Sequence, residues 1–132
     1  PAPKRPPVIN FRSEGRRFSN GPAGGRCLVP VSGFYEFTGA KYPKTRWVLR
    51  GVGEPFVALA AIWRAGAEGA PDAFSLLTAE PGPDVAPYHD RGVIPLPPAA
   101  WADWLFDRRS AGELLAPPPA GTLTAAEAPR PK

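Results

Sequence analysis

A carboxylate lies among aromatic residues in the stretch RCLVPVSGFYEF, residues 26–37. Glu36 follows Phe34 and Tyr35 and precedes Phe37. Apolar neighbours disfavour the charged form of a carboxyl group, which raises its pKa and suits it to proton transfer near neutral pH. The stretch is equally compatible with a solvent-facing carboxylate on a half-buried strand.

The chain has a single histidine, His89, in the segment PYHDRG. Asp90 and Arg91 follow it directly and can tune its charge in either direction, so it is a candidate general acid or base. The plainer interpretation is a loop histidine without a chemical role. One histidine and one cysteine do not make a typical zinc site, and no phosphate-binding glycine loop occurs. We therefore predict no metal and no cofactor.

Cys27 is the only cysteine, which excludes an internal disulfide and favours a reducing, cytoplasmic setting. It follows Arg26, whose charge would favour a nucleophilic thiolate. The interpretation we favour is a small buried apolar residue at the start of a strand.

Positive charge is concentrated in the first part of the chain. Residues 1–50 hold ten Lys or Arg against two acids, a net of +8, whereas residues 51–132 hold six against ten, a net of −4. Arginine binds phosphate through two parallel donors and stacks on bases, so this asymmetry indicates nucleic-acid binding, with a merely solvated basic face as the alternative. No apolar run approaches the ~20 residues that a membrane-spanning helix needs, so we predict no membrane partner.

The elements that must position these groups are short. Proline and glycine make up 34 of 132 residues, which favours brief strands joined by turns. Alternation and β-branched residues predict strands at 7–12, 27–30, 33–37, 45–50, 55–64, 73–79 and 93–96, with a hairpin through GVGEP at 51–55. Loops are predicted at 13–26 and 80–92, the second with one helical turn.

Helical signals appear only late in the chain. PPAAWADWLF places Trp101, Trp104 and Leu105 on one helical face, and Ser110 with Glu113 fits a capping box. The predicted class is α+β, rich in mixed and antiparallel strands, with a few short peripheral helices. We expect one domain over residues 1–124 and a disordered tail over 125–132.

Four motifs occur in an order that resembles one family. VINFRSE, RCLVPVSGFYEF, the strand ending at Thr78 and PYHDRG, with the spacing from Thr78 to His89, are similar to the SRAP domain, the SOS response-associated peptidase family. The resemblance runs from about Pro6 to about Leu123 and implies a β-rich SRAP-like fold. It also implies capture of abasic sites in single-stranded DNA during the DNA damage response. In the family, an N-terminal cysteine forms a thiazolidine with the opened sugar, and the activity extends to autoproteolytic, peptidase-type processing.

The resemblance also assigns roles to residues. Asn10 would orient the terminal cysteine and the opened sugar, Glu36 would exchange protons, and His89 would handle a sugar hydroxyl or Schiff-base proton. We expect these three side chains to meet in one pocket rimmed by guanidinium groups. The expected DNA-binding residues are Arg12, Arg91, Thr78, Arg16 and Arg17. The positive charge of Arg12 or Arg91 would lower the pKa of Glu36.

This chain departs from the family at its beginning. It starts at Pro1, just before the strand that carries Asn10, so the part of the family domain that bears the nucleophile is not in these 132 residues. Cys27 cannot replace it, because an internal cysteine lacks the free α-amine that closes a thiazolidine. We expect a longer polypeptide or a second chain to complete the fold, and an open sheet edge with marginal stability or association otherwise. The alternatives are a non-catalytic single-stranded DNA-binding module and a thiol peptidase using Cys27 and His89.

Overall fold

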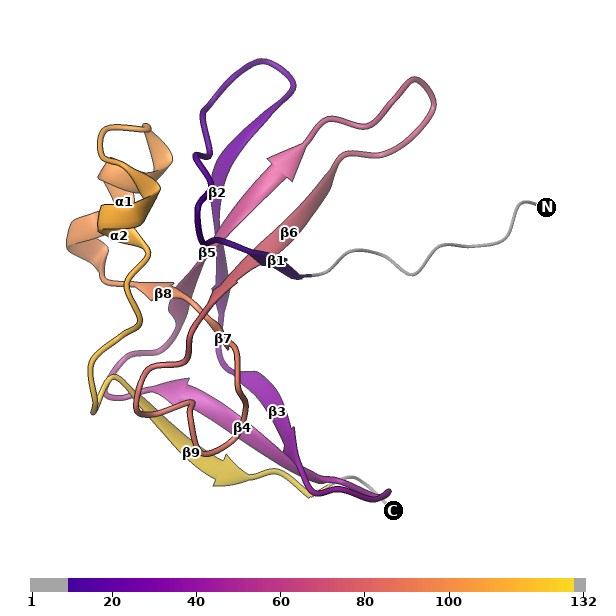
Figure 1. Cartoon of the computed structure of the whole chain (residues 1–132), viewed down its shortest axis with the longest axis vertical. Helices are drawn as coiled ribbons and strands as arrows, with labels where there is room; N and C mark the ends of the chain where they lie inside the picture. Colours follow the sequence, from indigo (N-terminus) through magenta and orange to yellow (C-terminus); the bar gives the residue numbers. More distant parts are fainter. Residues whose placement is uncertain (1–9, 130–132) are drawn as a thin grey trace.

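The computed structural model describes residues 10–129, and strands dominate it (Figure 1). Strand makes up 40% and helix 10%, in mixed and antiparallel sheets with two short helices, which confirms the predicted class. Residues 7–9 of the first predicted strand lie outside the described residues, as does Pro1. None of the helices within 10–129 is long and apolar enough to cross a membrane.

The larger sheet has six strands in the order β1-β6-β5-β2, with β7 added to β6 and β8 to β5. Only β1 runs parallel to its neighbour, and the other pairs are antiparallel. The strand at 73–79 is central, because β6 lies between β1 and β5. The strands are β1 (Asn10–Arg12), β2 (Gly24–Val31), β5 (Val57–Arg64), β6 (Ala73–Ala79), β7 (Gly92–Val93) and β8 (Pro95–Leu96).

The smaller sheet has three antiparallel strands, β3 (Phe34–Thr38), β4 (Thr45–Gly51) and β9 (Leu123–Glu127), in the order β3-β4-β9. The predicted hairpin through GVGEP is wrong, because β4 and β5 belong to different sheets. Residues 57–61 of β5 are buried on both faces. This stretch pairs with β2 along one edge, and with β8 and the end of β6 along the other.

The expected disordered tail also needs correction, since β9 continues to Glu127 and pairs with β4. Asp84 fixes the entry to β9. Its carboxylate accepts hydrogen bonds from the backbone N–H groups of Gly121, Thr122 and Leu123 at 3.0–3.1 Å. These contacts order a segment whose composition resembles a linker.

Strand β2 begins at Gly24, earlier than predicted, because the pairing with β5 starts there. A Cβ on Gly24 would lie 2.7 Å from the carbonyl oxygen of Trp63, and one on Gly25 would lie 2.6 Å from the Asn20 side-chain oxygen. Only glycine permits this close approach. The predicted strand at 93–96 is divided into β7 and β8 on either side of Ile94.

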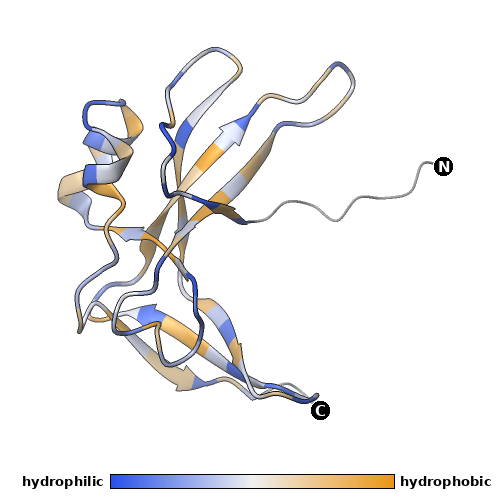
Figure 2. Cartoon of the chain, viewed as in Figure 1, coloured by the Kyte–Doolittle hydropathy of each residue, from blue (hydrophilic) through white to orange (hydrophobic). Residues whose placement is uncertain are grey.

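Two apolar cores lie on opposite faces of the larger sheet. On one face, α1 (Pro98–Leu105) and α2 (Ala111–Leu114) cover residues of β5, β6 and β8, with Trp104 fully buried. On the other face, residues of both sheets pack around Leu49, Leu59 and Val85. Figure 2 shows apolar residues along the strands of both sheets, interrupted by hydrophilic ones. The predicted cap is confirmed, because the Ser110 side chain accepts from the backbone N–H of Glu113.

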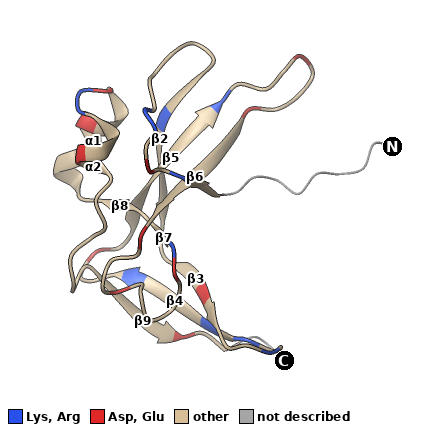
Figure 3. Ribbon diagram, viewed as in Figure 1, with Lys and Arg blue, Asp and Glu red and all other residues tan. Residues whose placement is uncertain are grey.

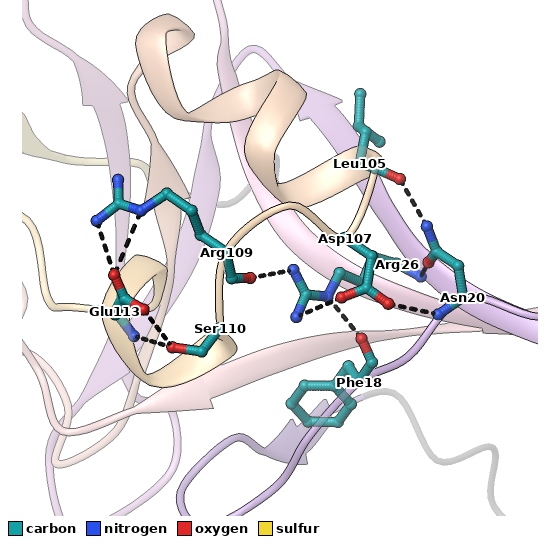
Figure 4. Close-up of polar contacts among 8 residues, drawn as sticks. All are labelled: Phe18, Asn20, Arg26, Leu105, Asp107, Arg109, Ser110 and Glu113. Atoms are coloured by element: carbon teal, nitrogen blue, oxygen red, sulfur yellow. Dashed lines mark hydrogen bonds and ion pairs between the residues drawn. The ribbon is translucent and has the colours of Figure 1, made fainter.

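A buried arginine joins the helices to the sheet (Figure 4). The Arg26 side chain, 3% exposed, donates to the carbonyl oxygens of Phe18 at 2.6 Å and Arg109 at 2.8 Å. Its guanidinium lies 3.3 Å from Asp107 and 4.4 Å from the centre of the Trp104 ring. This cluster connects β2 to the segment after α1.

Candidate functional site

The first candidate residues stand on β1, at the edge of the larger sheet. Asn10 pairs in parallel with Leu76, and Arg12 with Thr78. Asn10 and Arg12 are exposed and share one face, while Phe11 between them packs into the helix-covered core. The parallel pairing therefore brings Asn10 and Arg12 to the strand that ends at Thr78.

Glu36 lies on β3, and of its three predicted aromatic neighbours only Phe34 shares its face of the strand. Tyr35 and Phe37 are 54% and 40% exposed and point to the opposite face of the strand, so they do not enclose the carboxyl group. Its cross-strand partner is Trp47. The Trp47 ring packs on Tyr88 with ring centroids 5.1 Å apart, and its N–H donates to the Thr38 hydroxyl at 2.8 Å. Trp47, rather than Tyr35 or Phe37, is the aromatic residue that faces Glu36 across the sheet.

Burial raises the pKa of Glu36, and the positive charge of His89 acts in the opposite direction. The direction agrees with the predicted rise, but Tyr35 and Phe37 do not supply the burial that causes it. The opposing charge is the imidazolium of His89, where the sequence had suggested Arg12 or Arg91. This coupling places the lone histidine and the half-buried carboxyl group within electrostatic range of each other.

His89 ends the helical turn predicted within the loop at 80–92. Its backbone N–H bonds to the carbonyl of Val85, which is buried between the two sheets. Nδ1 lies 3.0 Å from the N–H and 2.9 Å from the carbonyl oxygen of Arg91, and 3.3 Å from an Asp90 oxygen. Nδ1 thus has an acceptor when protonated and a donor when not, as a proton-exchanging group needs.

Arg91 is not the exposed cation that the sequence predicted. Its guanidinium binds Glu14 in a bidentate ion pair at 2.6 and 2.7 Å, and it donates to the Thr78 carbonyl at 3.0 Å and hydroxyl at 3.2 Å. Only 18% of its side chain is exposed. Thr78, itself 7% exposed, therefore holds Arg91 in place. The many arginines make the sequence basic, but Arg91 is already bound to Glu14 and Thr78.

The remaining predicted arginines lie at and after β1 (Figure 3). Arg12, Arg16 and Arg17 are all exposed. The guanidinium of Arg16 stacks over the Phe11 ring at 4.2 Å. Arg12 also lies near enough to Glu14 to help lower the pKa of that carboxyl group.

Contacts link most of the predicted site residues into one chain. Glu36 lies within electrostatic range of His89. His89 is hydrogen-bonded to Arg91, Arg91 is hydrogen-bonded to Thr78, and Thr78 pairs with Arg12 on β1. Asn10 joins this chain through its strand, on the same face as Arg12. These residues come from β1, β3, β6 and the loop before β7, and together they form the candidate site.

Cys27 lies on the same sheet face as Asn10 but on the far edge strand. Strand pairing runs from Asn10 to Leu76, to Ala61 and to Cys27, which separates the first and last by about 14 Å at the usual strand spacing. Arg26 points to the other face and burial raises the pKa of the Cys27 thiol, so the predicted support of a thiolate by Arg26 is wrong. The apolar interpretation agrees with this environment.

Sequence reasoning overlooked Glu14, Trp47 and Tyr88. Glu14 belongs to the quoted VINFRSE motif, but its partner Arg91 is far along the chain. Among residues 10–129, no group of three His, Cys, Asp or Glu side chains could hold a metal ion. A groove of about 720 Å³ is lined by Phe56, Trp101 and proline-rich segments and contains none of the candidate site residues.

Comparison with known proteins gives a consistent result. Residues 3–130 match the family model described as SOS response associated peptidase (SRAP). A solved structure of a protein from Bordetella bronchiseptica is 26% identical, with a TM-score of 0.66, and the match covers 80% of this chain and 55% of that one. One from Bacteroides thetaiotaomicron is 21% identical, with a TM-score of 0.65, covering 77% of this chain and 48% of that one. None of the curated proteins matches. The chain thus spans about half the length of these two solved structures.

Proposed function

The chain belongs to the SOS response associated peptidase (SRAP) family, and from this membership we propose that the protein acts in the DNA damage response by capturing abasic sites in single-stranded DNA. The observation that carries the proposal is that Glu36, half-buried on β3, lies within electrostatic range of His89. A carboxyl group and an imidazole near the same reacting group can pass protons in both directions. Reaction of an amine and a thiol with an aldehyde requires such exchange at each step.

In this proposal, the reacting cysteine comes from outside the 132 residues, either from the same polypeptide or from a second chain. Its amine condenses with the sugar aldehyde and releases water, and its thiol then adds to the imine carbon to close a thiazolidine. Glu36 takes and returns the protons of the amine and thiol. His89 protonates the departing hydroxyl, and Asn10 orients the reacting groups. The same proton exchange would serve the peptidase-type processing that exposes the cysteine.

The DNA strand would run across β1, where exposed arginines are concentrated. Arg12 lies on the same face as Asn10, so it is placed to bind a phosphate next to the reacting sugar. Arg16 and Arg17 follow on the adjoining loop and would extend the contact. Such binding should weaken as salt rises, with a slope of about 0.7 per neutralised phosphate on a logarithmic scale.

The test is to incubate the complete protein with an abasic oligonucleotide and to follow a heat-stable adduct on a denaturing gel. We expect an adduct with the wild type and a rate about 100-fold lower in Glu36→Gln, the scale of lost acid–base catalysis. Glu54→Gln, which makes the same change in the separate groove, should react like the wild type. Absence of any adduct would contradict the proposal.

A second candidate function is non-catalytic binding of single-stranded DNA, which the exposed arginines around β1 favour. It predicts salt-sensitive binding with no covalent product, and unchanged binding in Glu36→Gln. Arg12→Ala should weaken binding under either proposal, whereas only the first predicts a rate effect at Glu36. A thiol peptidase built on Cys27 and His89 is not proposed, because Cys27 lies on the far edge strand and burial raises the pKa of its thiol.

A further inference from the structure

Glu14 binds Arg91, the arginine that the family resemblance assigned to a DNA phosphate. Both of its carboxylate oxygens accept from Arg91, at 2.6 and 2.7 Å, so the two side chains meet in a bidentate arrangement. A phosphate presents a pair of oxygens to a guanidinium in the same way. A carboxylate held in this place therefore competes directly with a phosphate.

The remaining donors of Arg91 are arranged around this contact. Its Nη2 also donates to Thr78, while its Nε–H is buried and has no hydrogen-bond partner within the part of the chain that the structure describes. The Thr78 bonds hold the guanidinium in place independently of Glu14. Arg91 thus has a fixed position, one donor without a partner and one carboxylate that can leave.

The loop that carries Glu14 allows the carboxylate to leave without moving β1. Ser13, 7% exposed, anchors the backbone through an N–H bond to the Thr78 carbonyl at 3.0 Å. Glu14 itself is 50% exposed, so rotation of its side chain leads into solvent. Gly15 follows with a φ of 72°, a turn that glycine accepts without strain.

Resting on the proposed function, we propose that Glu14 is a specificity-determining residue that occupies Arg91 in the free protein and yields it to a DNA phosphate. In the free protein the pair keeps a partly buried guanidinium neutralised. When a strand binds beside Arg12, its phosphate displaces the Glu14 carboxylate, which turns to solvent. The exchange disfavours anions too weakly held to displace a carboxylate, and so favours a nucleic-acid strand that makes several contacts at once.

The first test is oligonucleotide binding by Glu14→Gln across a range of salt concentrations. Removing the competing charge should tighten binding about three- to ten-fold, while the salt slope stays the same, because one phosphate reaches Arg91 in both proteins. Glu80→Gln is the matched control, because Glu80 acts on Arg91 through its charge but makes no hydrogen bond to it. A smaller gain in affinity is expected there.

The second test follows the two side chains by NMR. The ion pair lowers the pKa of Glu14 to about 2 in the free protein. The carboxyl titration should move up towards the ordinary value when the oligonucleotide saturates the protein, as Arg91 turns to the phosphate. An unchanged titration, together with equal affinity for the oligonucleotide in wild type and Glu14→Gln, would overturn the inference.

A separate probe keeps this inference distinct from the proposed function. If the wild type binds no oligonucleotide, the proposed function fails, and inorganic phosphate then tests Glu14 alone. The Arg91 Nε–H resonance should shift at lower phosphate concentration in Glu14→Gln than in the wild type or Glu80→Gln. Equal responses in all three proteins would contradict the role of Glu14.

Discussion

Replacement of Arg26 by alanine should destabilise the fold by an amount that its contacts allow us to estimate. The side chain is 3% exposed and makes two hydrogen bonds to carbonyl oxygens, one ion pair and one contact with an aromatic face. Each lost hydrogen bond costs about 1 kcal/mol, and a desolvated cation–π contact contributes about 2 kcal/mol.

The ion pair changes this sum little. Burial lowers the pKa of Arg26 and the charge of Asp107 raises it, so desolvation offsets much of the attraction. Recovery of the desolvation cost in Arg26→Ala reduces the loss, and we expect a net decrease of about 3 kcal/mol in the free energy of unfolding. For a chain of this size, that corresponds to a fall of about 12 °C in Tm.

The assay is urea denaturation followed by tryptophan fluorescence, to which the fully buried Trp104 should respond. Asp107→Asn is the matched control. It removes the charge but keeps a side chain that tolerates the φ of 55° and can still accept from the Asn20 N–H. It should cost about 1 kcal/mol, the scale of a half-exposed ion pair. A loss below about 1 kcal/mol in Arg26→Ala, or equal losses in both variants, would refute the estimate.

Three further outcomes are expected. Burial raises the pKa of Glu36 above its unfolded value of 4.5, so its ionised form opposes folding. Glu36→Gln should therefore be more stable than the wild type at pH 8. Denaturation curves at falling pH should show that this gain in stability vanishes by about pH 4.5. The thiol pKa of Cys27 is raised by burial, so iodoacetamide should alkylate the folded protein at pH 8 more slowly than the urea-unfolded protein, and equal rates would contradict its burial. Ser110→Ala should lower stability by about 1 kcal/mol through loss of the α2 cap, and a thermal melt against Ser19→Ala, an exposed serine with no assigned cap, would detect it.

Most strands could be located from the sequence because their signals are local. Alternation, β-branched residues and turn residues place β3, β4, β5 and β6 within one or two residues of the observed ends. Pairing depends on distant residues, and there the prediction was wrong at GVGEP. The apolar run with three alanines in β5 indicates a strand buried on both faces. The prediction relied instead on the turn residues of GVGEP, which favour a hairpin.

Strand β9 was overlooked for the same reason. The segment LTAAE has weak strand propensity, and it is ordered by β4 and Asp84, both distant in the sequence. Its neighbours are rich in proline, which favours the interpretation as a tail. Tertiary contacts decided its structure.

The candidate site was partly predictable. The raised pKa of Glu36 follows from an apolar setting, but the strand period of two already shows that Tyr35 and Phe37 cannot share its face. Trp47 takes their place, and only the register of β3 on β4 reveals it. The pairing of Glu14 with Arg91 joins two motifs that no local rule connects.

The late position of β9 has a consequence for synthesis of the protein. A ribosome releases β3 and β4 long before residues 123–127, so β4 emerges with unsatisfied backbone groups along one side. Until Asp84 binds the N–H groups of residues 121–123, the nascent chain exposes the edge of β4, with which another polypeptide can pair. Pairings between segments so distant also slow folding. The Asp84 carboxylate therefore bears on how long the newly made chain stays open to misassembly.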